Sequence, residues 1–189
     1  MLERYRNDER IVQINTFNAT SSKASGDRYF FTRYPICWGW ATWARAWRHI
    51  DFEMKIWKQE REKIFHRFGL WEGLIHYWRW NRNYWVLKNG GKSSIWDYQW
   101  DIYVSLKNKL CVIPEVNLIK NIGFMEGTHC SCGDKTLEQV CHGQLQFPLK
   151  HPETVCVDSV REAAYSSYFV CGFLHRRFDK IWKFLYRKS

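Results

Sequence analysis

The chain has 189 residues, enough for one compact domain or for part of a larger one. Hydrophobic residues make up 46% of the sequence and aromatic residues 18%, which supports a packed core and excludes a disordered chain. The formal net charge of +10 favours anionic partners such as nucleic acid, acidic lipid or phosphorylated substrates, and charge alone does not choose among them.

The cysteine content and the first residues predict a cytoplasmic chain. The seven cysteines show no paired framework spacing, and residues 1–6 are charged with no apolar run behind them, unlike a signal peptide. Reduced thiols are therefore expected. No stretch approaches the roughly 18 apolar residues that a membrane-spanning helix needs, so the sequence predicts a chain that does not cross a membrane.

The first part of the chain predicts two short strands and an aromatic segment. Ile11–Phe17 and Arg28–Thr32 are runs of β-branched and aromatic residues, which are typical of strands. Farther on, Gly39 lies between Trp38 and Trp40, where we expect no side chain to fit. This segment is either an aromatic plug in the core or a wall for a sugar ring, because indole faces stack on the apolar faces of sugars.

Three helices are predicted next. Thr42 is the expected N-cap of the first, in which Trp43 and Trp47 would face inward. Glu60–Phe68 and Leu70–Leu87 give the other two. The last of these carries apolar side chains on one broad stripe, at a helical spacing that core packing explains: Trp71, Leu74, Ile75, Trp78 and Trp85.

Two carboxylates mark a fourth helix, predicted over residues 94–107. Asp97 and Asp101 lie four positions apart, and like charges at this spacing weaken an isolated helix by roughly a few tenths of a kcal/mol. The helix N-terminus, a cation or a function would offset this cost. An adjoining stripe carries three aromatic rings: Trp96, Trp100 and Tyr103. Asp97 is therefore either a first-turn anion beside packed tryptophans or a reactive carboxylate.

Two short strands and a loop with metal-binding side chains follow. Leu110–Pro114 and Val116–Ile119 are the strand candidates. The loop carries several groups that bind metals in other proteins: Glu126, His129, Cys130, Cys132, Asp134, Cys141 and His142. The spacing of the first two cysteines is one residue short of the usual zinc-ligand spacing, so zinc is the less favoured interpretation.

Residues 153–189 predict an edge strand and a basic amphipathic helix. Val155–Val157 is the strand candidate, and Ser159 with Glu162 has the spacing of a capping box. We expect the helix to break at Ser166–Ser167. Its basic end either lies on an anionic membrane surface or docks its aromatic side on the rest of the chain.

The order of these features resembles the C-terminal half of the nucleotide-diphospho-sugar transferases of the GT-A fold. A Trp-Gly-Trp segment leads into a helix, and an acidic Trp-Asp-x-x-Trp helix precedes a short strand that ends in Pro. The next strand leads to Gly-Phe, with a His a few residues on. The sequence looks most like bacterial glycosyltransferase family 2-type proteins, some labelled hemolytic-protein-like. It is more distantly similar to N-acetylglucosaminyltransferases with a Trp-Asp-rich acceptor motif.

This resemblance implies the C-terminal portion of a GT-A fold, an α/β structure with a small mixed sheet, flanking helices and a C-terminal helical tail. Residues 1–152 would form the acceptor-side half of the domain, and residues 153–189 the edge strand and basic helix. The implied reaction transfers a sugar from a nucleotide-diphosphate donor to a saccharide acceptor, as in polysaccharide biosynthesis. The implied location is the cytoplasm, including the inner face of the membrane.

The resemblance also implies roles for individual residues. Asp97 would be the general base that takes the proton of the acceptor hydroxyl, and burial beside indoles would raise its pKa into a useful range. His129 would help to hold a Mg²⁺ or Mn²⁺ ion or the diphosphate. The implied acceptor-binding residues are Trp38, Gly39, Trp40, Trp96, Tyr98 and Asp101.

The donor-binding strands and the Asp-x-Asp-like motif of the family have no counterpart in this sequence. We therefore expect a truncated gene product, a fragment or one partner of a split enzyme that lacks the N-terminal half. Such a chain is expected to bind nucleotide sugar weakly or not at all by itself. The alternative is a non-catalytic carbohydrate-binding or interaction module derived from a glycosyltransferase. Nucleic acid is not expected as a partner, because the tryptophans recur at helical spacing and no reader motif is visible.

Overall fold

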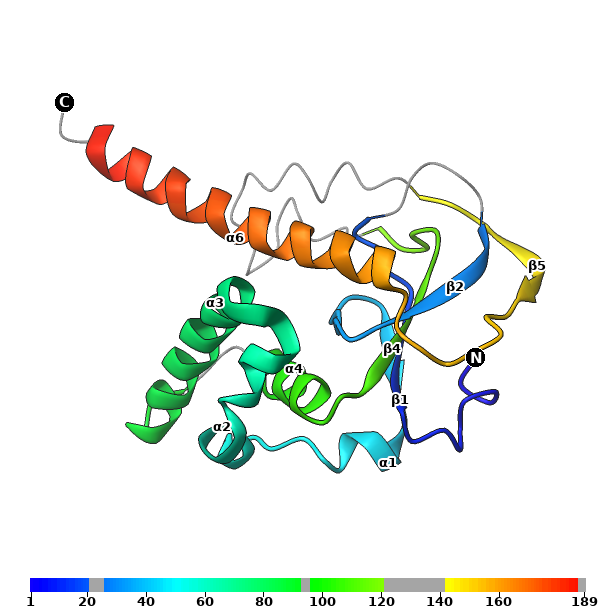
Figure 1. Cartoon of the computed structure of the whole chain (residues 1–189), viewed down its shortest axis with the longest axis horizontal. Coiled ribbons are helices and arrows are strands. Elements are labelled where there is room, and N and C mark those ends of the chain that lie inside the picture. The colour runs from blue at the N-terminus through cyan, green and yellow to red at the C-terminus, as the bar shows by residue number, and fades with distance from the viewer. Residues whose placement is uncertain (21–25, 93–95, 121–141, 187–189) are drawn as a thin grey trace.

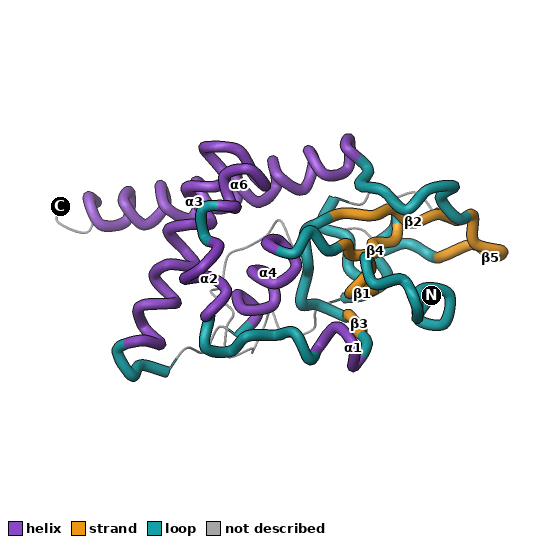
Figure 2. Tube along the Cα trace, turned by 60° about the horizontal axis from the view of Figure 1, so that its bottom comes forward, coloured by secondary structure: helices purple, strands orange, loops and turns teal. Residues whose placement is uncertain are grey.

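A computed structural model describes residues 1–20, 26–92, 96–120 and 142–186. Apart from one short helix beside the sheet, the helices gather on one side of the molecule and the strands on the other (Figures 1 and 2). The C-terminal helix extends away from the sheet (Figures 1 and 2). The chain is therefore mixed α/β, with a five-stranded mixed sheet and flanking helices. This is the coarse architecture that the sequence predicts.

The sheet combines parallel and antiparallel pairs. Its strands are β1 (Ile11–Asn15), β2 (Gly26–Thr32), β3 (Trp40–Thr42), β4 (Leu110–Pro114) and β5 (Leu145–Lys150). Their order across the sheet is β3-β1-β4-β2-β5. The pairs β1–β4 and β2–β5 are parallel, and β1–β3 and β2–β4 are antiparallel. The continuous apolar run of β4 fits its central position, because both faces of this strand are covered. Strand β1 is also buried, but it carries the polar residues Gln13 and Asn15.

The helices are α1 (Ala44–Trp47), α2 (Lys55–Glu60), α3 (Lys63–Lys88), α4 (Asp97–Leu106) and α6 (Ser159–Tyr186). The two helices predicted over Glu60–Phe68 and Leu70–Leu87 join into α3, which has a kink at Gly69. The backbone φ of Gly69 is 71°, a left-handed conformation that glycine adopts without steric cost. The predicted boundary between the two helices is therefore a real break in helical geometry.

Helix α4 lies between the sheet and the other helices (Figure 2). Trp100 and Val104 on one side of α4 pack with Val12 of β1 and Cys111 of β4. Ile102 and Leu106 face the helical layer. There they pack against a second group of buried residues. This group comes from α2, from α3 and from the residue before α2: Met54, Trp57, Ile64, Trp80 and Tyr84. Both faces of α4 are thus fixed by packing.

Helix α6 is held to the sheet and to α3 by a buried charge network. Glu162 Oε1 accepts hydrogen bonds from Arg33 Nε and from Arg67 Nη2, each at 3.0 Å. Its other oxygen accepts from Thr32 Oγ1 at 2.5 Å. Arg67 belongs to α3, and its side chain is only 4% exposed. One carboxylate therefore joins three elements that are distant in sequence.

Three local predictions were wrong. Thr42 does not cap a helix, because it belongs to β3 and its hydroxyl donates to the carbonyl of Val12 at 2.6 Å. The first residue of the predicted capping box, Ser159, is not the N-cap of α6. Asp158 takes that role, with its Oδ1 accepting from the N–H of Arg161 at 3.0 Å. Helix α6 also continues without a break through residues 166–167.

The predicted strands near the loop are reduced to single bridges. Within Val116–Ile119 only Asn117 pairs, with His142. Within Val155–Val157 only Val157 pairs, with Phe31 of β2. The sheet edge beyond β2 is instead occupied by β5, which the sequence analysis did not predict.

No helix in the described ranges is long and apolar enough to cross a membrane. The four cysteines in those ranges, Cys37, Cys111, Cys156 and Cys171, are free thiols.

We predict that Glu162→Gln lowers the free energy of unfolding by about 3–5 kcal/mol, because it leaves the buried guanidinium of Arg67 without a charged partner. Urea unfolding at neutral pH measures this change. The matched control is Glu3→Gln, which removes an ion pair with Arg6 in which the Glu3 side chain is 77% exposed. The control should cost under about 1 kcal/mol, and equal losses in the two variants would contradict the assigned role of Glu162.

Candidate functional site

Four indoles gather at the N-terminal end of α4. Trp40 of β3 stacks on Trp96 with ring centroids 6.1 Å apart and contacts Trp100 at 5.6 Å. Trp47 of α1 contacts the same two rings at 6.1 and 5.7 Å. Trp100 is fully buried, whereas Trp96 is 42% exposed. The cluster is therefore part of the core at its inner end, at Trp100, and forms an exposed aromatic surface at its outer end, at Trp96.

The inner end of this indole cluster is anchored to the sheet. The Nε1 of Trp100 donates a hydrogen bond to Gln13 Oε1 at 2.5 Å. The amide nitrogen of Gln13 donates in turn to Asn15 Oδ1 at 2.5 Å and to the carbonyl of Ile36 at 2.7 Å. Gln13 of β1 thus forms hydrogen bonds both to α4, which carries the two aspartates, and to the segment that leads to Trp38.

Gly39 is required here for a reason that the sequence did not reveal. Its φ is +52°, and a Cβ at this position would lie 2.3 Å from Thr16 Oγ1 and 2.7 Å from Ile119 Cδ1. A side chain at position 39 is therefore excluded by Thr16, which follows β1, and by Ile119, which follows β4. The sequence analysis expected the exclusion from the flanking indoles alone. The neighbouring Trp38 packs edge to face against Phe17, with ring centroids 5.1 Å apart.

The two aspartates of α4 have unusual electrostatics. Burial raises the pKa of Asp97, against the opposing effects of backbone N–H groups in the first helical turn and of the positive charge of Arg79. Burial raises the pKa of Asp101 well above its ordinary value, and the negative charge of Asp97 raises it further. The pair therefore binds protons more readily than two solvated carboxylates would.

The positive charge of Arg79 in α3 limits the rise in the pKa values of Asp97 and Asp101. Its Nε and Nη2 donate to the hydroxyl of Tyr98, at 3.2 and 3.0 Å. Its guanidinium also lies 5.0 Å from the centre of the Tyr98 ring and 4.8 Å from that of Phe169. Tyr98, a predicted acceptor-binding residue, is thus directed toward α3. Arg79 was not identified from the sequence, because no local pattern links it to a helix that begins at residue 97.

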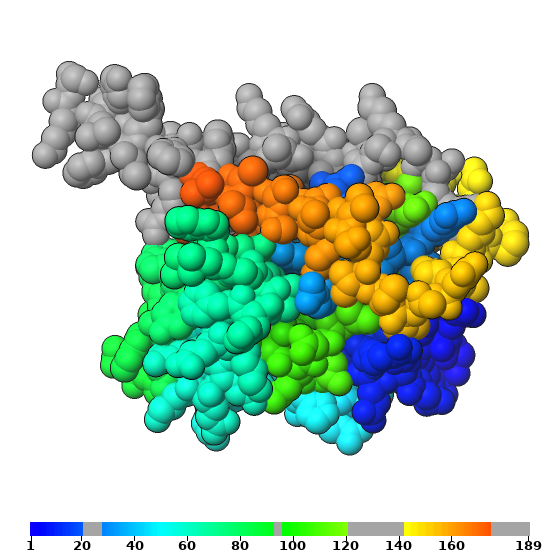
Figure 3. Space-filling view, viewed as in Figure 1, coloured from blue at the N-terminus to red at the C-terminus, as the bar shows by residue number. Residues whose placement is uncertain are grey.

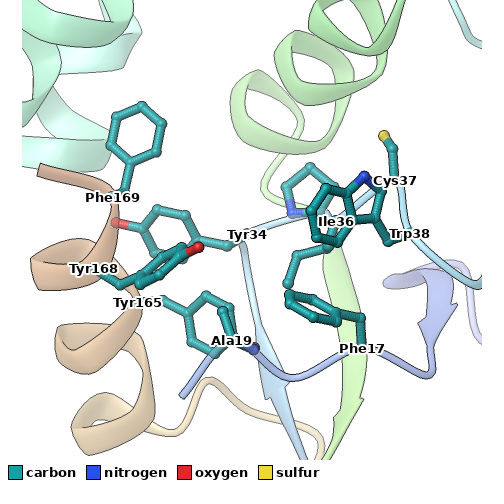
Figure 4. A pocket seen from close by; sticks show the side chains of 10 residues that line it. Phe17, Ala19, Tyr34, Ile36, Cys37, Trp38, Tyr165, Tyr168 and Phe169 are labelled. Atoms are coloured by element: carbon teal, nitrogen blue, oxygen red, sulfur yellow. The ribbon is translucent and has the colours of Figure 1, made fainter. Parts of the chain in front are cut away.

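A pocket of about 240 Å³ lies next to this site, between α6 and the segment before β3. Figure 4 shows Cys37 and Trp38 at one end of it and Tyr168 and Phe169 at the other. Burial raises the pKa of the Cys37 thiol, and the charges of Asp101 and Asp97 raise it further, so the thiol lies within electrostatic reach of both carboxylates. The lining is almost wholly apolar: Phe17, Ala19, Tyr34, Pro35, Ile36, Cys37, Trp38, Tyr165, Tyr168 and Phe169.

The structure brings together most of the residues predicted for the site. Trp40, Trp96, Asp97 and Asp101 lie around the start of α4, and Trp38 and Gly39 lie on the adjoining segment. His129 lies outside the described residues, as do the other loop residues from Glu126 to Cys141, so their predicted roles stay predictions. Within the described ranges, no group of three or more His, Cys, Asp or Glu side chains is arranged to hold a metal ion.

Comparisons with known protein families, with curated proteins and with solved structures found no match to this chain.

We predict that Asp101→Asn stabilises the chain at neutral pH. A carboxyl whose pKa is raised by folding stabilises the folded state below its ordinary pKa of 3.8, and this contribution is lost as pH rises through the raised value. Asparagine mimics the protonated form at every pH, so it avoids that loss. Thermal unfolding at pH 7 should give a higher Tm, by roughly 2–4 °C for each kcal/mol gained at this chain length.

Measuring the same variant at lower pH provides the control. The difference in Tm between Asp101→Asn and the unaltered chain should shrink toward zero as pH approaches 3.8. A lower Tm of the variant at neutral pH, or a difference independent of pH, would contradict the assigned burial of this carboxyl.

Proposed function

We propose that this chain is the acceptor-side half of a glycosyltransferase that uses a nucleotide-diphosphate sugar, with Asp97 as the general base. The observation that carries the proposal is the position of Asp97. It is a half-buried carboxylate with a raised pKa, next in sequence to an exposed indole that stacks on a second indole. A base with a raised pKa supports proton removal from an acceptor hydroxyl, and the adjoining indoles supply an apolar surface for the acceptor ring.

The aromatic platform accounts for acceptor binding. The stacked rings of Trp40 and Trp96 offer an apolar surface at the outer end of the indole cluster. The apolar face of a saccharide ring lies against such a surface, while its hydroxyls remain free for polar contacts. A ring held there lies beside the first turn of α4, where Asp97 begins the helix.

Asp97 then acts on one hydroxyl of the bound saccharide. As the hydroxyl oxygen forms its bond to the anomeric carbon of the donor, the O–H bond breaks and its proton passes to the Asp97 carboxylate. The bond between the donor sugar and the nucleotide diphosphate breaks with its electron pair staying on the diphosphate. Burial makes this carboxylate a stronger base than a solvated one, because its ionised form is less stabilised by water.

Asp101 is a positioning residue in this proposal. It lies one helical turn after Asp97, and burial together with the charge of Asp97 favours its protonated form. The positive charge of Arg79 lowers the pKa values of both carboxyls, which keeps Asp97 ionised to a lower pH than burial alone would allow.

The remaining partners of the reaction belong to the proposal as well. A Mg²⁺ or Mn²⁺ ion would neutralise the diphosphate, with His129 as its candidate ligand. The donor-binding strands would come from an N-terminal half. The setting is polysaccharide biosynthesis in the cytoplasm or at the inner face of the membrane.

We predict that Asp97→Asn lowers the rate of sugar transfer by about 10²–10⁴-fold, since a general base typically contributes that much. Transfer from a panel of labelled nucleotide sugars to saccharide acceptors with Mn²⁺ measures it. The assay uses the 189-residue chain and, in parallel, the longest polypeptide encoded by its reading frame. Glu53→Gln is the control, because Glu53 is an exposed partner of Lys55. Transfer that survives Asp97→Asn at the original rate would contradict the role of the base.

We predict that Trp96→Ala weakens saccharide binding about tenfold, the loss that corresponds to one aromatic contact, while Asp97→Asn retains it. Binding is measured on the 189-residue chain by saturation-transfer NMR with an acceptor panel. Trp71→Ala is the matched control, since Trp71 is an exposed indole of α3. Saccharide binding without any transfer would favour the carbohydrate-binding alternative. Absence of both binding and transfer would contradict the proposed function.

A further inference from the structure

The stripe of α3 that the sequence assigns to the core lies on the surface. Trp71 is 79% exposed, Leu74 45%, Trp78 43% and Trp85 53%. These four residues fall at i, i+3, i+7 and i+14, so they lie on one side of the helix, which we call the aromatic face of α3. The opposite side of the helix is buried and carries Glu72, Gly73, His76, Trp80, Asn83 and Tyr84.

The aromatic face points outward because the opposite side of α3 is fixed in the core by the contacts of Glu72 and His76. Glu72 accepts a hydrogen bond from the hydroxyl of Tyr34 at 2.6 Å and lies 3.3 Å from His76 Nε2. The His76 ring is stacked between Phe68 and Phe169, with ring centroids 4.2 and 4.3 Å away. These partners fix the rotation of α3 about its axis. The outward position of the indoles is therefore a property of the folded chain.

The exposed charges carried by residues 63–92 have one sign. Between residues 63 and 92 the only acidic residue is Glu72, which is buried. The exposed basic residues in this interval are Lys63, Arg82, Lys88 and Lys92. Arg82 is exposed, and its guanidinium lies 5.9 Å from the centre of the Trp78 ring. A partner with anionic groups above an apolar layer complements this surface.

Helix α6 contacts the aromatic face at Trp78. Phe173 of α6 contacts Trp78 edge to face, with ring centroids 6.0 Å apart. Beyond Phe173 the helix continues to Tyr186, and the sequence of residues 175–188 contains six Arg or Lys and one Asp. In the space-filling view α6 crosses above α3 and leaves the side of α3 toward the viewer uncovered (Figure 3).

We propose that the aromatic face of α3 docks on the surface of an anionic phospholipid bilayer. The indoles enter the interfacial region, which tryptophan prefers because its ring is apolar and its N–H polar. The exposed Arg and Lys side chains beside them, such as Arg82 and Lys88, meet the lipid phosphates. The absence of a spanning helix in the described ranges makes this contact peripheral.

A bilayer fits this surface better than other anionic partners do. Nucleic acid would use the charge, but a patch of four large apolar side chains at heptad spacing has no role on a phosphate backbone. A second copy of the chain would place two equally basic surfaces against each other, which is unfavourable without intervening anions. The inference stands apart from sugar transfer, because none of the four side chains lies in the indole cluster beside Asp97.

The test is vesicle co-sedimentation of the 189-residue chain. One set of vesicles is phosphatidylcholine alone, and the other also contains phosphatidylglycerol. We expect binding to the anionic vesicles, weakened by added salt, and little binding to the neutral ones. Trp71→Gln/Trp85→Gln should lower the partition coefficient at least about tenfold, because two large apolar side chains no longer enter the interface.

The matched control is Phe147→Gln, which removes a 76% exposed aromatic residue from β5, at the opposite side of the molecule (Figure 1). Circular dichroism checks that all variants are folded, and sedimentation velocity reports their mass. The control should bind vesicles as the unaltered chain does. Failure of the unaltered chain to bind anionic vesicles, or an equal loss in the control, overturns the proposal. The same holds if the double variant changes only self-association or binding to an RNA oligonucleotide.

Discussion

The burial of Trp100 is the constraint on which the arrangement of the site depends. Its indole contacts Trp40 and Trp47, and its N–H is satisfied by Gln13 within the sheet. The N–H of a buried indole usually has such a hydrogen-bond partner. This packing fixes both the depth of α4 and its rotation about its axis. The same rotation leaves Trp96 at the surface and holds Asp97 and Asp101 in a partly desolvated position.

A desolvated carboxylate pair is unfavourable for folding, and the surrounding structure limits that cost without removing it. The helix N-terminus favours an anion at Asp97, and Arg79 lowers the pKa values of both carboxyls. The guanidinium of Arg79, which belongs to α3, donates a hydrogen bond to the hydroxyl of Tyr98, which belongs to α4. Buried ionisable groups with shifted pKa values are typical of functional sites, where such shifts serve proton transfer. The charge network around Glu162 differs, because every charge there meets an opposite one.

The sequence predicted those elements whose local pattern and tertiary environment agree. Strand β4 is a continuous apolar run that is buried along its whole length. The kink of α3 lies at Gly69, where the predicted helical pattern is interrupted. The carboxylate pair was found because its spacing is internal to one helix. The outward stripe of α3 was missed because the hydrogen bonds of buried Glu72 and the stacking of His76, both long-range, override its apolar periodicity. Strand β5 was missed because it contains Pro148, which disfavours a strand except at an edge.

The most direct test of the central claim is the titration of the Asp97 and Asp101 carboxyls by ¹³C NMR in the folded chain. The account predicts that both titrate above their ordinary pKa of 3.8 and that Asp101 is the last of the two to ionise as pH rises. It also predicts that removing the charge of Asp97 lowers the pKa of Asp101. A pKa at or below 3.8 for Asp97 would mean that this carboxylate is an ordinary solvated anion at a helix start, and the base assigned to it would have no physical foundation.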